Sequence, residues 1–300
     1  DGIYGSMIGE EIIRCPVCNS DKLEPHSNVV DHFGHKDLFS LSICRTCETL
    51  ITNPRPTEKE SITYYKSNSY ASHGDSQGYI FDKVYQTIQT INFSRKRAVL
   101  EKYTLHKNHL DYGCGTGSFI SYLQSKGWAA TGVEPDDKAR SIAIERNQGG
   151  NIYPSLDQLD KHLRFSSISL FHVLEHVHQL RETMQKIISL LDDNGTLILA
   201  LPNYNSLDSQ YYKDYWAGLD VPRHLYHFSQ TSIEQLAKSF GLNIVATHPM
   251  TFDSYYVSLL SEEYKNGSKN YLNAFMRGYK SNQAAKKTNE YSSLIYVLSK

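Results

Sequence analysis

Hydrophobic and polar positions alternate along the chain in a way that predicts an α/β fold. Short apolar runs with the length of buried strands lie at 108–111, 129–133, 151–153, 165–171, 196–201, 242–247 and 292–298. Segments with apolar residues at three- and four-residue steps, typical of amphipathic helices, lie at 79–103, 138–146, 180–191 and 230–240. This order predicts a mostly parallel sheet with helices on both faces and an antiparallel hairpin at its end.

Other parts of the chain lack a clear period. Residues 64–75 are polar and aromatic, and we expect a functional loop there, with a disordered connector as the alternative. The tyrosine-rich stretch 204–222 is expected to be a loop on the substrate side, and 255–290 a partly helical, Lys- and Asn-rich insertion. The break Asn53-Pro54-Arg55-Pro56 suits a boundary. We therefore predict a small β-rich module at 1–56 and a main domain at 57–300, which divides into an entry segment (57–107), a core (108–250), an insertion (251–291) and a last strand (292–300).

Four of the five cysteines form two C-x-x-C pairs, Cys15/Cys18 and Cys44/Cys47, within the module 1–56. In a chain without a secretion signal such pairs indicate zinc rather than disulfides. Four thiolates close a tetrahedral site and leave no position for water, so we expect a structural rather than a catalytic Zn²⁺. A segment this short has little core of its own, and metal binding would supply its folding free energy.

The stretch Asp111–Gly117 reads D-Y-G-C-G-T-G between a predicted strand and a predicted helix. Glycines there let the backbone approach a ligand, which then meets the free N–H groups of the helix N-terminus. The next strand ends at Glu134, where an acid suits hydrogen bonds to two ribose hydroxyls. A dinucleotide fingerprint would need a glycine at Ser118, so the spacing disfavours NAD. An ordinary glycine-rich turn is the remaining alternative.

The D-x-G-C-G-T-G pattern followed by G-V-E-P at 132–135 resembles the first two motifs of class I S-adenosylmethionine (SAM)-dependent methyltransferases. The hexamer H-V-L-E-H-V at 172–177 and the stretch D-x-G-T-L-x-L-x-x-P-N at 193–203 resemble the same broad group, which includes quinone and sugar methyltransferases. The resemblance covers about 79–300 and implies a seven-stranded, Rossmann-like, mostly parallel sheet, with SAM as the cofactor. The SAM-binding positions expected from the motif and the resemblance are Tyr70, Ser72, His73, Asp111, Gly113, Cys114, Gly115, Gly117, Glu134, Pro135, Ser155, Leu156 and His172.

Glu175 and His176 follow the central strand 165–171, at the edge where open α/β sheets carry their active sites. Because the sulfonium of SAM is already activated, the enzyme mainly aligns the nucleophile, and an oxygen or nitrogen nucleophile must also lose a proton. An imidazole with an ordinary pKa of about 6.5 accepts a proton at neutral pH, so His176 is the candidate general base. Glu175 would orient His176 or hold the substrate. Two alternatives stay open: polar residues that cap a helix start, and a divalent-metal site at Glu175 and His176.

A second polar and aromatic cluster, His224, Tyr226 and His227, is expected to face His176 across the same pocket. We count His224 among the catalytic candidates, with a buried structural loop as the alternative. The neighbouring Arg223 suits an anionic group of the substrate, because a guanidinium binds phosphate or carboxylate well.

Composition and charge reduce the number of functions that the chain could have. The net charge of −1 gives no global electrostatic reason to bind nucleic acid or an anionic membrane. No apolar run approaches the roughly 18–20 residues that span a bilayer, and the first residues lack a signal-peptide pattern, so we expect a cytoplasmic protein without a membrane partner. The leading hypothesis is methyl transfer to a small-molecule acceptor, with sugars and glycan precursors as the suggested class. The alternatives are an RNA methyltransferase that uses the zinc ribbon as a nucleic-acid handle, and a non-catalytic SAM-binding protein.

Overall fold

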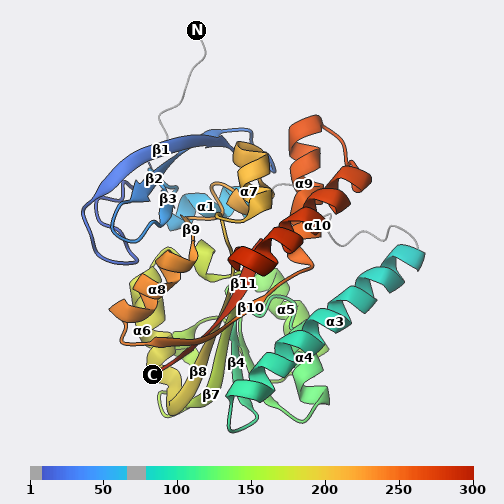
Figure 1. Cartoon of the computed structure of the whole chain (residues 1–300). Coiled ribbons are helices and arrows are strands. Elements are labelled where there is room, and N and C mark those ends of the chain that lie inside the picture. The colour runs from blue at the N-terminus through green and yellow to red at the C-terminus, as the bar shows by residue number, and fades with distance from the viewer. Residues whose placement is uncertain (1–8, 66–78) are drawn as a thin grey trace.

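The computed structural model describes residues 9–65 and 79–300, with residues 79–88 described by their backbone alone. Its main body is a seven-stranded sheet of order β10-β11-β8-β7-β4-β5-β6 (Figure 1). The strands are β4 (Asn108–Tyr112), β5 (Ala129–Val133), β6 (Ile152–Tyr153), β7 (Phe165–Phe171), β8 (Leu191–Pro202), β10 (Asn243–Pro249) and β11 (Ser293–Ser299). Neighbouring strands from β6 to β8 run parallel, and β11 runs antiparallel to both β8 and β10. The predicted fold class, including the terminal antiparallel hairpin, is confirmed.

Helices cover both faces of this sheet because each strand buries side chains on both sides. Along β8, Leu197 and Leu199 belong to one buried cluster, whereas Ile198 and Ala200 belong to the other. The first cluster packs under α6 (Leu180–Leu190) and α8 (Gln230–Ser239). The second packs under α3 (Tyr79–Tyr103) and α4 (Ser118–Ser125), with α5 (Asp137–Arg146) beside them. Figure 1 shows these two groups of helices on opposite sides of the sheet.

Local sequence signals explain where several of these helices begin. The side chain of Asp136 accepts a hydrogen bond from the Ala139 N–H at the start of α5. At the start of α8, Ser229 and Ser232 form a reciprocal capping box that satisfies two backbone N–H groups. In α6, Leu180, Met184 and Ile187 are buried at helical spacing. The predicted bounds of these helices agree with the structure to within a residue or two.

The amino-terminal module contains three antiparallel strands, β1 (Leu23–Val30), β2 (Leu38–Cys44) and β3 (Leu50–Thr52). A fourth strand, β9 (Tyr226–His227), comes from the main domain and pairs with β3. Ile51 of the module also lies in the buried cluster that contains Leu199. The two predicted domains, 1–56 and 57–300, thus share a sheet and a hydrophobic core, and their boundary stays a sequence-based prediction.

Three segments are more helical than the sequence pattern predicted. The stretch 204–222, expected as a loop, contains α7 (Leu207–Tyr212) and short 3-10 helices at Lys213–Tyr215 and Ala217–Leu219. The insertion forms a hairpin of α9 (Asp253–Asn266) and α10 (Tyr271–Thr288). Helix α1 (Glu58–Tyr65) includes the first two residues of the expected polar loop, 64 and 65. The buried carboxylate of Asp208 explains the first difference, because it accepts hydrogen bonds from Trp216, Ser281 and Ser292 and so ties α7 to α10 and β11. Within the described residues, no helix is long and apolar enough to cross a bilayer.

Candidate cofactor and catalytic site

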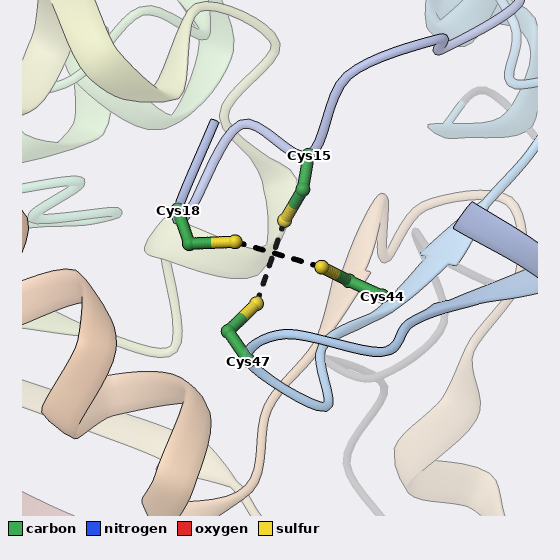
Figure 2. A group of neighbouring side chains, drawn as sticks. All are labelled: Cys15, Cys18, Cys44 and Cys47. Atoms are coloured by element: carbon green, nitrogen blue, oxygen red, sulfur yellow. Dashed lines mark hydrogen bonds between the residues drawn. The ribbon is translucent and has the colours of Figure 1, made fainter. Parts of the chain in front are cut away.

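The four predicted zinc ligands converge in the amino-terminal module (Figure 2). The Sγ atoms of Cys15 and Cys47 lie 3.5 Å apart, as do those of Cys18 and Cys44, and all four lie within 4.8 Å of one another. Two similar turns present them: the N–H of Asn19 donates to the carbonyl of Cys15, and the N–H of Glu48 to that of Cys44, both at 2.8 Å. Asn19 and Glu48 share a left-handed φ of about 60°.

This arrangement fits a tetrahedral zinc ion. Zinc–sulfur bonds of about 2.3 Å in a tetrahedron place the sulfur atoms about 3.8 Å apart, close to the 3.5 Å observed. Three of the cysteines are fully buried, and Cys18 is half-buried. The donor set of four sulfurs suits a structural Zn²⁺, and these residues would hold it.

The glycine-rich turn connects β4 to α4 at the carboxyl edge of the sheet. Gly113, Gly115 and Gly117 all have left-handed φ angles between 55° and 76°, which favour glycine. A Cβ at Gly113 would lie 2.4 Å from Val173 Cγ2, and one at Gly117 would lie 2.5 Å from Asn147 Nδ2. At Gly115, in contrast, a Cβ would meet no protein atom within 4 Å. Gly115 therefore presents open space where a ligand can approach the backbone.

Two buried acids flank this turn. The carboxylate of Glu134, at the end of β5, accepts hydrogen bonds from the N–H groups of Gly115 (2.8 Å) and Asp136 (2.9 Å). Asp111, in β4, accepts one from the Ser169 hydroxyl at 2.6 Å. Burial raises the pKa of Asp111 to about 6, although the nearby Lys96 opposes the shift. Burial also raises the pKa of Glu134. Asp111 suits a positively charged group and Glu134 suits the hydroxyls of a ribose, so the residues around the turn fit SAM.

The remaining cofactor candidates lie on the same edge or outside the described residues. The thiol of Cys114 packs into the helix-covered core, where burial raises its pKa, so only its backbone belongs to the turn. Pro135 follows Glu134 and is exposed. Ser155 and Leu156 follow β6, the strand next to β5. Tyr70, Ser72 and His73 fall outside the described residues, and their role stays a sequence-based prediction.

His172 leaves β7 with a left-handed φ of 56°, a conformation that costs a non-glycine residue about 1–2 kcal/mol. Its Nε2 lies 3.2 Å from the Asp253 carboxylate at the start of α9, and its Nδ1 lies 3.5 Å from Glu175. Burial disfavours the charged ring, but these two carboxylates outweigh burial and raise the pKa of His172 to about 9. His172 is therefore a cation at neutral pH. Asp253 had no sequence signal, because it lies 81 residues further along the chain.

The two other histidines of the cluster have defined tautomers. His176 Nδ1 lies 2.9 Å from the carbonyl oxygen of Arg223, and His224 Nδ1 lies 2.9 Å from that of Gly218. Because a carbonyl only accepts, each Nδ1 carries the proton and each Nε2 keeps a lone pair. Burial and the neighbouring His224 lower the pKa of His176 to about 4, so the ring is neutral at pH 7. The centres of the His176 and His224 rings are 4.7 Å apart.

Glu175 lies beside both imidazoles and is almost completely buried, with 1% of its surface exposed. Neither of its carboxylate oxygens has a hydrogen-bond partner among the described residues. Burial opposes its ionisation, but His172, His176 and His224 lower its pKa. One donor atom from each of Glu175, His176 and His224 lies within 4.8 Å of the others. This set could hold a divalent metal, and it contains one carboxylate and two imidazoles rather than the several oxygens that magnesium prefers.

The residues that flank His224 are structural. The guanidinium of Arg223 is buried between the carboxylates of Asp31 and Asp220, each at 2.7 Å, so it does not offer its charge to an anionic substrate as expected. The hydroxyl of Tyr226 accepts a hydrogen bond from Arg55 at 2.6 Å. His227, also in β9, places Nε2 3.4 Å from the Thr52 hydroxyl. Of the second predicted cluster, only His224 contacts His176.

Sequence reasoning also missed two side chains near the site. The Tyr65 hydroxyl, at the end of α1, lies 3.0 Å from His176 Nδ1. The ammonium of Lys96, in α3, lies 3.9 Å from the centre of the Phe171 ring and near Asp111. A lysine on a predicted amphipathic helix carries no signal of its own, because solvated lysines are common there.

Comparison with known proteins shows which family the chain belongs to. A family model described as a methyltransferase domain matches residues 85–247. The ubiquinone biosynthesis O-methyltransferase of Rickettsia bellii is 26% identical over 133 residues, which cover 41% of this chain and 55% of that protein. The protein of the same name from Rickettsia canadensis is 22% identical over 209 residues, 63% of this chain and 85% of the relative. The chain thus spans about half the length of the first curated relatives that it matches.

Among solved structures, magnesium protoporphyrin IX methyltransferase from Synechocystis PCC 6803 with bound SAH superposes with a TM-score of 0.52 and 18% identity, over 81% of this chain and 100% of that chain. At this identity the superposition shows a shared fold. The matched model spans 163 of the 300 residues and contains the glycine turn, Glu134 and the 172–176 segment. The chain therefore belongs to the methyltransferase-domain family, and its core has the fold of class I SAM-dependent methyltransferases.

Proposed function

We propose that the protein transfers the methyl group of SAM to an oxygen or nitrogen atom of a small molecule, with His176 as the general base. The observation that carries this proposal is the fixed tautomer of His176. Its Nδ1–H donates to the Arg223 carbonyl, which leaves the lone pair of Nε2 to accept a proton. Of the three side chains in the cluster, His176 alone is partly exposed, whereas Glu175 and His224 are buried.

The packing of two loops supports this role. Val173 fills the space above Gly113, so the segment 172–176 lies directly against the glycine turn. When bound, SAM supplies an electrophilic methyl group. The turn and Glu134 would hold the cofactor, and His176 would take the proton from the acceptor as it is methylated. Glu175 places a negative charge beside His176, which opposes the burial and the neighbouring His224 that lower the pKa of His176 to about 4.

The chemical class of the methyl acceptor is a separate and more specific proposal. The resemblance suggested sugars and glycan precursors, whereas the curated relatives are named ubiquinone biosynthesis O-methyltransferases. Both classes present hydroxyl groups, which suit a base such as His176 Nε2. We therefore propose a hydroxylated small molecule, with sugar derivatives and hydroxylated aromatic compounds as the two classes to test. An RNA acceptor is disfavoured by the net charge of −1.

A metal-assisted site is a second candidate, favoured by the buried Glu175, whose oxygens accept no hydrogen bond among the described residues and whose carboxylate lies 3.5 Å from His172 Nδ1. Glu175, His176 and His224 would hold the ion, which would supply Lewis-acid chemistry toward a hydroxyl group of the acceptor. Measurement of the bound metal distinguishes the general-base mechanism from the metal-assisted one. The wild-type protein is expected to hold one zinc in the cysteine site, and a second bound metal that is lost in Glu175→Gln would favour this candidate.

The proposal is tested by transfer of label from methyl-labelled SAM into a size-fractionated extract. Label in the small-molecule fraction would support it, and label in RNA would refute it. His176→Asn should then lower turnover by about 10²–10⁴-fold while SAM binding persists, because the amide can replace the Nδ1–H donor but not the basic Nε2. His178→Gln is the matched control, since His178 lies two residues away and contacts Pro56 and Ser61 instead. Unchanged turnover in His176→Asn would remove His176 from the mechanism.

A further inference from the structure

Helix α10 exposes an apolar face that the proposed activity does not use. Its opposite side packs on α9 and α7 through small residues such as Ala274 and Gly278. On the outer side, Leu272 is 77% exposed and Phe275 57% exposed. The exposed apolar side chains of α10 are Tyr271, Leu272, Phe275, Met276 and Tyr279. At 100° per residue they occupy one sector of roughly 140°, so they form a continuous stripe along the first half of the helix. We call these five residues the α10 stripe.

The charge around this stripe differs from that of the rest of the chain. Residues 264–289 contain six basic residues and no Asp or Glu. Outside this segment, acidic residues outnumber basic residues, 32 against 25. Lys280, Lys286 and Lys287 of α10 are all exposed. Lys280 and Lys287 occupy the sector of the helix next to the stripe, and Lys286 and Lys287 lie about two turns beyond its end at Tyr279. Positive charge therefore lies along one side of the stripe and beyond its carboxyl end.

The hairpin of α9 and α10 lies at the edge of the molecule. Figure 1 shows α9 and α10 at the upper right of the molecule, on its periphery, away from α6 and α8. A helix that presents an apolar stripe bordered by lysines is typical of segments that lie in the plane of a membrane interface. Tyrosine suits this environment as well, because its ring is apolar and its hydroxyl is polar.

The same charges argue against two other partners that could cover an apolar helix face, a second copy of the chain and a single-stranded nucleic acid. In a two-fold dimer through this stripe, segment 264–289 would pack on its own copy, where its six basic residues would meet basic residues and no Asp or Glu. Single-stranded nucleic acid also binds lysines and aromatic rings, but Leu272 and Met276 offer no ring on which a base can stack. An anionic lipid surface matches both the aliphatic side chains and the lysines.

We propose that the α10 stripe and its three lysines dock the protein onto a bilayer that contains anionic lipids. The contact is peripheral, since no helix of the described chain is long and apolar enough to span a bilayer. It differs from the sequence-based expectation that the protein has no membrane partner. That expectation used the net charge of the whole chain, which averages the basic segment 264–289 with an acidic remainder.

The test is co-sedimentation of the full chain with vesicles of phosphatidylcholine and phosphatidylglycerol, compared with vesicles of phosphatidylcholine alone. We expect binding to the anionic vesicles that weakens as salt is added. Changing Lys280, Lys286 and Lys287 together to Gln should weaken binding on the order of 100-fold, because each basic residue near such a surface contributes about fivefold. Replacing the two exposed anchors, Leu272→Ser with Phe275→Ser, should also abolish sedimentation.

Matched controls lie elsewhere on the surface. Leu105→Ser removes a side chain that is 76% exposed at the start of β4, and Lys161→Gln removes an exposed lysine. Both controls should sediment like the wild type. The lysine variants and the controls should keep the wild-type unfolding temperature because their side chains are exposed. Phe275 also stacks on Tyr255 of α9, so thermal unfolding must show that Leu272→Ser with Phe275→Ser stays folded at the assay temperature. Vesicle binding does not require catalysis, so its failure is separate from a failure of the proposed activity.

Three results would overturn the proposal. The first is the absence of sedimentation with anionic vesicles, and the second is sedimentation that the α10 variants leave unchanged. The third is a different occupant: a dimer in light scattering, or binding of a single-stranded RNA oligonucleotide, that is lost in Leu272→Ser with Phe275→Ser while vesicle binding is absent.

Discussion

Gly115 offers a direct test of the cofactor cradle. Its φ of 55° is left-handed, and a Cβ there would touch no protein atom within 4 Å. The variant Gly115→Ala therefore has two separable effects. The strain of a left-handed alanine costs about 1–2 kcal/mol of folding free energy. The added methyl group also occupies the open space into which, by our interpretation, SAM binds.

Gly127 supplies the matched control. It has a φ of 78°, and a Cβ there also meets nothing within 4 Å, but it lies at the other end of α4. Gly127→Ala should lose the same folding free energy, which for a chain of this size lowers the unfolding temperature by a few degrees. Only Gly115→Ala should also lose cofactor affinity. We expect a weakening of at least about tenfold in Kd, equivalent to about 1.4 kcal/mol.

Calorimetric titration with SAM and thermal unfolding measure the two effects separately. Equal shifts of the unfolding temperature with a weakened Kd in Gly115→Ala alone would support the cradle. If Gly115→Ala bound SAM as tightly as Gly127→Ala, the glycine turn would not face the cofactor. Gly113→Ala should behave differently again, because its methyl group would lie 2.4 Å from Val173 Cγ2 and disturb folding itself.

Three further outcomes test other parts of the structure. Cys47→Ser should reduce the zinc content and lower the unfolding temperature, because Cys47 belongs to the core that the module shares with the main domain; unchanged metal content in elemental analysis would contradict a four-thiolate site. Burial lowers the pKa of His109 to about 3, below its value of about 6.5 in the unfolded chain, so this residue should reduce stability by about 1.4 kcal/mol per pH unit as the pH falls from 6.5 toward 3. Urea unfolding at pH 7 and pH 5 should therefore show a smaller pH dependence for His109→Gln, and an equal dependence would refute the assignment. Asp208→Asn should cost about 2–4 kcal/mol in the same assay, because one of its three hydrogen-bond donors, among them Trp216, would meet an amide N–H; a loss below 1 kcal/mol would show that this hub is not needed.

Local patterns in the sequence determined much of the fold, the glycine turn of the candidate cofactor site and the cysteine cluster. The strand β7 and the helix α3 were predicted with the bounds that the structure shows, because hydrophobic period depends only on neighbouring residues. The glycine turn and the two C-x-x-C pairs could be predicted from the sequence equally well. A left-handed turn requires glycine, and a zinc knuckle requires two cysteines at fixed spacing, so each signal lies within a few residues.

Only the tertiary structure decided the chemistry beside that turn. The tautomer of His176 is set by the carbonyl of Arg223, 47 residues away, and the charge of His172 by Asp253. The same holds for Arg223, which the sequence offered to a substrate and the fold pairs with Asp31 of the amino-terminal module. A hydrogen bond between distant segments leaves no period or spacing in the sequence. Its partners are chosen by which strand ends and loops the packed sheet brings together, and that choice belongs to the folded chain as a whole.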